Sequence, residues 1–466
     1  VMPGWCCCDH WEKWKNWDAE DHIIAGKCLR DQVRRLRNHA CILTWLYGSD
    51  YPPTAEVEKM YLEVFKENNW PNPHQSSAAL KPTEVTGYSG IRMEGPYFFT
   101  EPSYWLLDTL RGGAFGFNAE IGPGASIPKM ESILEMFPAD HLWPVDDYWH
   151  YHARGGNPAK MLDIDNAALN ARFGKAKNLE DYVKKSHMQA YEGKRAMFEA
   201  YARNKYISTG VIQWMMNNAW PGVYWNLYDY FLRTGGSYFG TKKACEPLHI
   251  QYSYDDRSVV AVSSFLETYK GLKASVSVLN FDLKEKYSNT VTFDMEPDGV
   301  KRLDTIPEIK DLSVTYFVKL ELKDSAGKIV SSNFYWLSTV KEVFNWEKSY
   351  FWTTPMISYP DYIALQSLPE VRLEVTGKID TEKAEGQVRI IVSNPSDKLA
   401  FGVNVMLANN DNGKEIIPVL WDDNYFALLP GEKKELTATY TGEKLKEKNP
   451  VIKVAGWNVS TVNVSL

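Results

Sequence analysis

Hydrophobic and polar positions follow two different periods in the two halves of the chain. Up to about Cys245, short apolar runs alternate with patterns of helical period, as in a parallel sheet whose strands are buried beneath helices. The apolar run 42–47 is one expected strand, and Thr54 is a plausible cap of the helix that follows it. The core-facing positions of that helix recur at helical spacing: Val57, Met60, Tyr61, Val64 and Phe65.

Further expected strands cover residues 83–88, 93–99, 115–119 and 211–216, and a long helix covers 187–203. The first half therefore reads as a β/α domain. The rules for parallel connections leave a barrel or a doubly wound sheet as the two choices.

From about Glu246 the helical period stops and alternating strand patterns begin, with Gly327 and Gly431 in turns between them. Residues 258–263, 272–279, 315–322 and 333–337 form one set of expected strands, and 387–393, 403–408 and 435–440 form another. We therefore expect a multidomain chain: a β/α domain at 1–245, an immunoglobulin-like β-sandwich at 246–340, an aromatic-rich connector at 341–369 and a second such sandwich at 370–466.

Composition narrows the class of partner. The 466 residues carry a formal net charge of −7 at pH 7, so no basic field attracts nucleic acid or an anionic membrane, and no apolar stretch is long enough for a membrane span. Aromatic residues make up 14% of the chain, which fits sugar-stacking surfaces but fits a large core as well. The six cysteines form no C-x-x-C pair, so we expect thiols that are mostly buried and neither a metal site nor a cofactor. His150 and His152 resemble a metal pair on a strand, but no third ligand is predicted, so a structural or loop role is favoured.

Two acidic residues follow strand signals and precede glycine or proline. Asp50 ends the run from Trp45, and Glu120 ends the run from Phe115. In a β/α barrel the reactive groups lie where strands end, and glycoside hydrolysis needs such a carboxyl pair. Spacing alone does not select this pair, because seven other acids also lie near element ends: Asp9, Glu84, Glu94, Glu101, Asp146, Asp147 and Asp229.

At these residues the sequence resembles the exo-β-D-glucosaminidase branch of glycoside hydrolase family 2, enzymes that release glucosamine from the non-reducing end of chitosan. The matching stretches run through the whole chain in order: 3–9, 39–50, 86–90, 95–97, 112–120, 210–220, 246–252, 285–289, 335–338 and 456–458. The resemblance implies a (β/α)8 TIM barrel followed by the two sandwiches. It also implies that Asp50 is the general acid/base and Glu120 the nucleophile of a retaining, double-displacement mechanism, with the carboxyl groups about 5 to 5.5 Å apart.

The resemblance also implies roles for residues around this pair. Most relatives carry Asn-Glu where this chain has Ser49-Asp50, and Ser-Asp is linked to enzymes that accept a 2-amino sugar. Tyr97 either hydrogen-bonds the nucleophile or packs, and Trp220 forms either the floor under the terminal sugar or part of a core. Asn217 and Asn218 bind sugar hydroxyls or serve their own backbone turns.

About six barrel strands, the first at Val1-Met2, are expected where a closed barrel has eight. By resemblance, the missing N-terminal domains of the enzyme are partners of this chain, along with an oligosaccharide or polysaccharide substrate, and such a substrate suggests a secreted or periplasmic enzyme. Three alternatives remain at this stage: a β-mannosidase or endo-β-mannosidase, for which Asn-Glu would be expected, a non-catalytic carbohydrate-binding protein, and a scaffold or adhesin.

Overall fold

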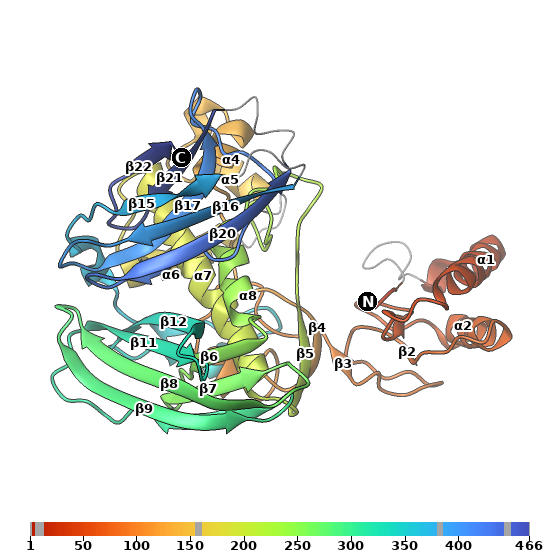
Figure 1. Cartoon of the computed structure of the whole chain (residues 1–466). Helices are drawn as coiled ribbons and strands as arrows, with labels where there is room; N and C mark the ends of the chain where they lie inside the picture. The colour runs from red at the N-terminus through yellow and green to blue at the C-terminus, as the bar shows by residue number, and fades with distance from the viewer. Residues whose placement is uncertain (1, 5–13, 154–160, 380–384, 442–448, 466) are drawn as a thin grey trace. The chain divides into compact units, whose positions relative to one another are not determined.

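The computed structural model describes residues 2–4, 14–153, 161–379, 385–441 and 449–465. These residues form two compact units (Figure 1). The first unit comprises Val1–Gly95, Thr109–Ile121 and Tyr206–Gln213, and the second comprises Pro96–Asp108, Gly122–Lys205 and Trp214–Leu466. No helix among the described residues combines the length and the apolar character that a membrane crossing requires.

The first unit contains short parallel strands and two helices. Strand β1 (Trp45–Leu46) pairs with β2 (His74–Gln75), and a second sheet has the order β3 (Ile91–Arg92), β4 (Gly116–Ile121) and β5 (Ser208–Gln213). Helices α1 (Ala19–Leu36) and α2 (Ala55–Glu67) lie side by side (Figure 1), and their apolar faces pack on Trp45 and Tyr47. The expected helix after Thr54 is thereby confirmed.

The expected strands of this region are only partly present. The run 42–47 shortens to β1, 115–119 lies in β4, and 211–216 overlaps β5. The predictions of strands at 83–88 and 93–99 are wrong. Residues 83–87 close a turn through paired backbone hydrogen bonds between Thr83 and Gly87, whose positive φ a strand does not allow. Of the first expected strand, Val1 lies outside the described residues, and Gly4 makes a single parallel bridge to Leu46.

The short helix η2 (Trp14–Asn16) also lies in the first unit. The second unit carries the following helices: α3 (Tyr104–Leu107), α4 (Met130–Met136), η3 (Ala139–His141), α5 (Asp147–His152), α6 (Met161–Phe173), α7 (Leu179–Arg203) and α8 (Gly236–Ala244). The expected helix 187–203 is the second part of α7. Helix α8 packs against α7 through two glycines, since a Cβ on Gly236 would lie 1.9 Å from the carbonyl oxygen of His187 and one on Gly240 2.2 Å from that of Tyr191.

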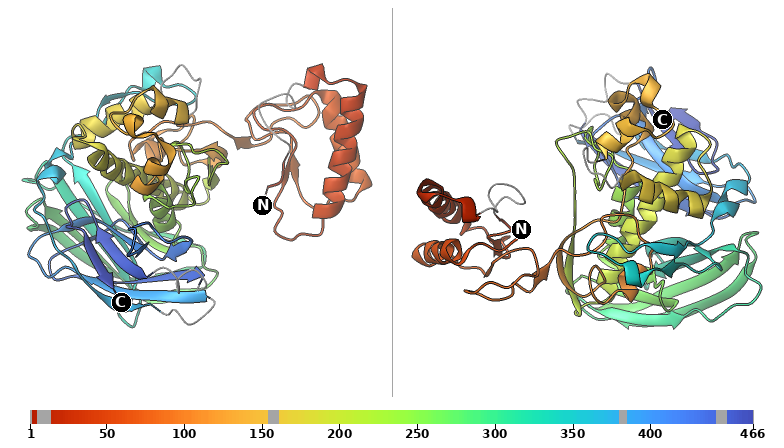
Figure 2. Two further views of the ribbon diagram at one scale, coloured as in Figure 1. Left: turned by 90° about the horizontal axis from the view of Figure 1, so that it is seen from above. Right: turned by 180° about the vertical axis from the view of Figure 1, so that it is seen from behind.

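Two antiparallel β-sandwiches complete the second unit, and Figure 2 shows their sheets from two further directions. The first consists of a sheet β10-β7-β6 (Val300–Thr305, Ser258–Ser263, Leu248–Tyr252) and a sheet β12-β11-β8-β9 (Ile329–Ser338, Thr315–Lys323, Tyr269–Asn280, Glu285–Met295). Inward-facing side chains such as Leu272, Val276 and Leu320 form its core. The strands expected from the alternation are confirmed here.

The second sandwich has the sheets β15-β16-β20-β18 (Glu374–Ile379, Glu385–Ser393, Lys433–Thr441, Val419–Trp421) and β19-β17-β21-β22 (Phe426–Leu428, Ala400–Asn409, Pro450–Ala455, Val462–Ser465). The connector between the sandwiches holds β13 (Val343–Phe344) and β14 (Met356–Ser358), which pair with each other, and the short helices η4 (Trp346–Lys348) and η5 (Ile363–Ser367). Trp346 of the connector stacks on Tyr104 of α3 with ring centroids 5.9 Å apart.

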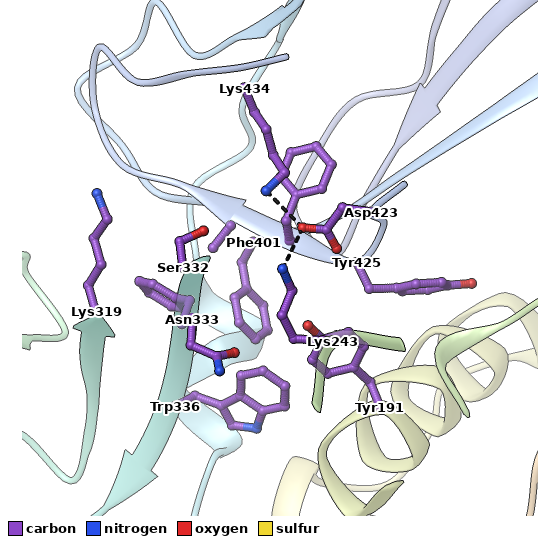
Figure 3. A pocket seen from close by; sticks show the side chains of 13 residues that line it. Tyr191, Lys243, Lys319, Ser332, Asn333, Trp336, Phe401, Asp423, Tyr425 and Lys434 are labelled. Carbon is purple, nitrogen blue, oxygen red and sulfur yellow. Dashed lines mark ion pairs between the residues drawn. The ribbon is translucent and has the colours of Figure 1, made fainter. Parts of the chain in front are cut away.

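Helices α7 and α8 meet both sandwiches at one junction (Figure 3), where Asp423 lies between the ammonium groups of Lys243, at 3.0 Å, and Lys434, at 2.8 Å. The two lysines hold the pKa of the Asp423 carboxyl well below its usual range, against the opposing effect of burial, and the ion pair is therefore charged across the neutral pH range. Trp336 and Phe401 contact each other beside it. The cavity here has a volume of about 50 Å³, which is room for water but not for a sugar ring.

The prediction of mostly buried thiols is wrong for the described cysteines, because Cys28, Cys41 and Cys245 are exposed. Cys28 lies on α1 outside its buried face, which consists of Ala25, Gly26, Leu29 and Val33, Cys41 lies after this helix, and Cys245 is the C-cap residue of α8. Cys6, Cys7 and Cys8 lie outside the described residues.

Candidate active site

Asp50 stands at the end of a tight turn that follows β1. The backbone amides of Ala78 and Ala79 donate to the carbonyl oxygens of Gly48 and Ser49, both at 3.2 Å. Gly48 leaves no space for a side chain, since a Cβ there would lie 2.3 Å from the carbonyl oxygen of Tyr51. In this turn the Ser49 hydroxyl donates to the half-buried Asp50 carboxylate at 3.3 Å.

Glu120 is the fifth residue of β4 and is half-buried. The fully buried Asn118 fixes this part of the strand, because its Nδ2 donates to the carbonyl oxygen of Glu94 at 2.7 Å and its Oδ1 accepts from the Glu120 amide at 3.3 Å. Arg92 of β3 donates to the carbonyl oxygens of Gly113, at 2.7 Å, and Phe115. These contacts set the path of the chain that leads into the strand.

One small apolar cluster connects the two carboxyl-bearing segments. Ala78, Ala79 and Met93 form it, and Leu46 and Ala119 pack against it. Leu46 belongs to the strand before Asp50, Ala78 and Ala79 hold the Gly48-Ser49 turn, and Ala119 directly precedes Glu120. The structure therefore brings the chain segments that carry Asp50 and Glu120 together in the first unit, although 70 positions separate them.

A third carboxyl group, which the sequence analysis did not single out, is hydrogen-bonded to Tyr47, the residue directly before the Asp50 turn. Glu58 of α2 is fully buried, and its Oε1 accepts from Tyr47 Oη at 3.3 Å, from Thr83 Oγ1 at 3.0 Å and from Thr86 Oγ1. Burial raises the pKa of Tyr47 to about 12, and burial also lowers the pKa of the nearby His74. The helical pattern of the sequence could have indicated this burial, because Glu58 directly follows the core residue Val57 on the buried side of the helix.

The other expected sugar-binding residues belong to the second unit. Tyr97 is buried, its amide donates to the Trp352 carbonyl at 2.9 Å, and its own carbonyl accepts from Trp225 Nε1 at 2.7 Å. It lies five positions beyond the end of β3 instead of on a strand.

Trp220 is 44% exposed and stacks on His152 with ring centroids 5.4 Å apart, so its side chain is available at a surface and is not part of a core. Asn217 is exposed, and Asn218 accepts from the Trp220 amide at 2.8 Å, which is the backbone role expected as the alternative for a loop amide.

The two histidines of the expected metal-like pair are not on a strand. They lie two positions apart on α5, where side chains at that spacing point in different directions. His150 pairs with Asp163 at 3.3 Å, and His152 Nδ1 is 2.7 Å from the Pro221 carbonyl oxygen. Within the described ranges, no three His, Cys, Asp or Glu side chains are grouped so that they could hold a metal ion. Of the other acids near element ends, Asp9 lies outside the described residues.

Family models match both sandwiches. Residues 351–459 match the exo-β-D-glucosaminidase Ig-fold domain, and residues 255–342 match the mannosidase Ig/CBM-like domain. The exo-β-D-glucosaminidase of Streptomyces avermitilis is 39% identical over the whole chain, which covers 53% of that relative. The chain thus spans about half the length of the curated relatives it matches.

Solved structures give the same result. The exo-chitosanase CsxA of Amycolatopsis orientalis superposes with a TM-score of 0.95 at 36% identity, covering all of this chain and 57% of that one. Variants of CsxA with a glutamate or an aspartate replaced by alanine have been solved as complexes with PNP-β-D-glucosamine. The β-D-mannosidase of Dictyoglomus thermophilum, at 18% identity, TM-score 0.70 and coverage of 96% of this chain and 52% of that one, shares the fold. By sequence and by fold, this chain is therefore similar along its whole length to exo-β-D-glucosaminidases, over about half the length of those relatives.

Proposed function

We propose that this chain contributes the catalytic carboxyl pair of a retaining, exo-acting glycoside hydrolase that releases β-linked D-glucosamine from the non-reducing end of chitosan or chitooligosaccharides. The observation that carries the proposal is the shared cluster of Leu46, Ala78, Ala79, Met93 and Ala119, which draws the Asp50 turn and the Glu120 strand together. Relatives named for this activity match the whole chain, and CsxA variants lacking one glutamate or one aspartate bind the aryl glucosaminide.

In the proposed first step, a Glu120 carboxylate oxygen attacks C1 of the terminal sugar from the face opposite the leaving group. Asp50 donates its proton to the glycosidic oxygen as the C1–O bond breaks, and the shortened chain leaves with that proton. In the second step, Asp50 removes a proton from water, whose oxygen attacks C1 and releases Glu120. Two inversions at C1 give β-configured glucosamine.

The Ser49-Asp50 turn supports the choice of a 2-amino sugar. The Ser49 hydroxyl is engaged with the Asp50 carboxylate and is shorter than the asparagine amide that most relatives place there. A carboxylate-lined pocket favours the ammonium group of glucosamine by charge attraction, which is strong in a partly buried site. Trp220 would stack on a sugar ring with its exposed face, and the resemblance gives Tyr97, Asn217 and Asn218 roles in sugar binding.

We further propose that strands β1 to β5 belong to a (β/α)8 barrel that further strands of a longer protein complete. Their parallel pairing and the position of both acids at or near strand ends support this architecture. A polymeric substrate also fits a secreted or periplasmic enzyme. No metal or cofactor takes part in the proposed steps.

A β-mannosidase or endo-β-mannosidase is the second candidate, because the first sandwich matches a mannosidase domain model. The Ser-Asp pair argues against it. A non-catalytic carbohydrate-binding protein or a scaffold is a weaker alternative, since neither requires both acids.

Hydrolysis of matched p-nitrophenyl β-D-glucosaminide and β-D-mannoside by the full-length protein, with Glu120→Gln beside the wild type, tests the proposal. We expect turnover of the glucosaminide that the variant loses. Turnover of the mannoside alone would assign the second candidate, turnover of neither would favour a binding protein, and turnover unaffected by the substitution would remove Glu120 from the mechanism.

A further inference from the structure

Two ionisable side chains are buried behind the turn that directly follows β4. Asp165 of α6 is 2% exposed and Lys194 of α7 is fully buried. Burying a charged group costs several kcal/mol unless specific partners compensate it, so the partners of these two groups indicate what they do.

The Asp165 carboxylate holds two loops at once. Its Oδ1 accepts from the Phe99 amide at 2.7 Å, its Oδ2 accepts from Tyr224 Oη, and the Ala125 amide also donates to the carboxylate. Phe99 lies in the segment that follows β3, and Ala125 lies in the segment that follows β4. One carboxylate therefore ties the two segments to helix α6.

Lys194 holds the same turn from α7. Its Nζ donates to the Pro123 carbonyl oxygen at 2.9 Å. The Asp165 charge favours the protonated ammonium, but burial outweighs it and lowers the pKa of Lys194 to about 7. Burial likewise raises the pKa of Asp165 to about 7, against the hydrogen bonds that it accepts.

The turn 122–125 packs closely against these groups. The amides of Gly122 and Gly124 donate to the carbonyl oxygens of Pro96 and Tyr97, both at 3.3 Å. Gly124 has a φ of +75°, and a Cβ there would lie 2.5 Å from Asp165 Oδ1 and 2.8 Å from the Phe99 amide nitrogen. The backbone therefore lies directly against the carboxylate.

A second residue of helix α6, Arg172, also contacts the segment that contains Phe99. Arg172, seven positions after Asp165, places its guanidinium 4.8 Å from the centre of the Phe99 ring and pairs with Glu101 at 3.0 Å. The segment 96–101 and the turn 122–125 thus rest on one rigid support, made of α6 and α7.

We propose that Asp165 and Lys194 are positioning residues for the reaction: within the second unit they fix the turn 122–125, and by fixing Phe99 they fix the segment of Tyr97. Neither group touches the substrate. This proposal rests on the proposed role of Tyr97. It concerns residues that the sequence analysis did not select, because an aspartate and a lysine inside helices of ordinary composition carry no signal.

The test compares variants of the full-length protein with p-nitrophenyl β-D-glucosaminide. Asp165→Ala removes every acceptor, Asp165→Asn retains an oxygen for the Phe99 amide, and Lys194→Met removes only the ammonium group. Asp423→Asn is the matched control, because Asp423 is also a buried aspartate held by specific partners, here two lysines, but lies in the second sandwich. Melting temperature, kcat and KM are measured for each.

We expect kcat to fall at least about tenfold in Asp165→Ala and Lys194→Met with KM changed by less than about threefold, since misplacing a reacting group by an ångström costs up to about 100-fold. Asp165→Asn should recover most of the loss, and Asp423→Asn should lower the melting temperature without lowering kcat. If Asp165→Ala does not fold, Lys194→Met and Asp165→Asn decide.

Wild-type kcat in a folded Lys194→Met protein would overturn the proposal, as would a kcat loss in Asp423→Asn equal to that in the Asp165 variants. Failure of the proposed function has a different signature, since the wild type itself would not turn over the glucosaminide or Glu120→Gln would stay active.

Discussion

The two units of the molecule are held together in different ways. The sandwiches of the second unit have long ladders, with twelve residues in β8 and eleven in β9, and large apolar cores between their sheets. In the first unit, β1, β2 and β3 have two residues each. Ladder hydrogen bonds and a large core can therefore hold the sandwiches in their fold. They cannot by themselves fix the backbone of the part of the chain that carries Asp50 and Glu120.

Buried polar groups and close backbone contacts take that role in the first unit. Glu58 gathers three hydroxyls under the Asp50 turn, Asn118 and Arg92 fix the backbone around β4, and Gly48 admits no side chain. Such contacts fix atoms in direction as well as distance, which catalysis requires and which apolar packing alone does not provide.

The largest expected effect is a loss of activity when the proposed nucleophile in the first unit is replaced, with no such loss when an acid of the second unit is replaced. Glu120→Gln should lower kcat for an aryl glucosaminide at least about 1000-fold, because the nucleophile is lost, and should leave the melting temperature within a few degrees. Steady-state kinetics and calorimetry check this. Exchanging an acid of the second unit that faces solvent, Asp397→Asn, is the control and should leave kcat unchanged.

Asp50→Ala should show a substrate-dependent loss. Without the acid, hydrolysis of chitobiose, whose leaving group needs a proton, should fall about 100- to 10,000-fold, and the first step with a p-nitrophenyl leaving group should fall much less. Added azide should restore turnover of the aryl substrate, because it attacks C1 without a general base. Equal losses on both substrates, with no response to azide, would contradict the assignment.

Glu58 tests whether a buried carboxylate supports the first unit. Glu58→Ala leaves the Tyr47, Thr83 and Thr86 hydroxyls without their shared acceptor, at about 1 to 3 kcal/mol for each unsatisfied group. We expect a clear loss of stability and of activity together. The control is Glu56→Ala, which removes an exposed glutamate two positions earlier on the same helix. It should change the unfolding free energy by no more than about 1 kcal/mol. Similar effects of the two substitutions would remove the support role.

The second unit has its own pH-dependent element at His187. This buried histidine accepts from Tyr425 Oη at Nδ1, 2.6 Å away, and its Nε2 faces the Pro128 carbonyl oxygen. Burial lowers its pKa to about 4. The unfolded chain therefore takes up a proton first as the pH falls below about 6.5, and stability is lost between pH 6.5 and pH 4 but not further below.

That loss should approach about 3 kcal/mol in denaturant titrations across the window. His187→Gln removes the titrating group and should flatten the profile there. A profile with the same slope in the variant would assign the pH dependence to other groups.

The sequence alone predicts the sandwiches well, for a physical reason. Strands such as β8 (Tyr269–Asn280) and β11 (Thr315–Lys323) alternate buried and more exposed residues because each has an inward and an outward side, and Gly327 marks the turn between β11 and β12. The helix α2 is found for the same reason. Here periodicity and burial coincide.

Periodicity fails where short strands meet the site. Residues 83–88 have the apolar content of a strand, but Thr83 and Thr86 turn toward Glu58 and Gly87 closes the loop. His150 and His152 have strand-like spacing but lie on α5, where Asp146 caps the helix. Asp50 and Glu120 were selected by resemblance, since spacing left seven other acids open. Glu58, Asp165 and Lys194 act through contacts between distant segments, which no local pattern records.

The central claim is that Glu120 forms a covalent bond to the sugar while Asp50 exchanges the proton. Mass spectrometry of the full-length Asp50→Ala protein, quenched during turnover of p-nitrophenyl β-D-glucosaminide, tests it most directly, since the variant lacks the base that releases the intermediate. We predict that the peptide containing Glu120 gains the mass of one glucosaminyl residue. The same label on another carboxylate, or an unlabelled peptide while p-nitrophenol is released in a burst, would contradict the account.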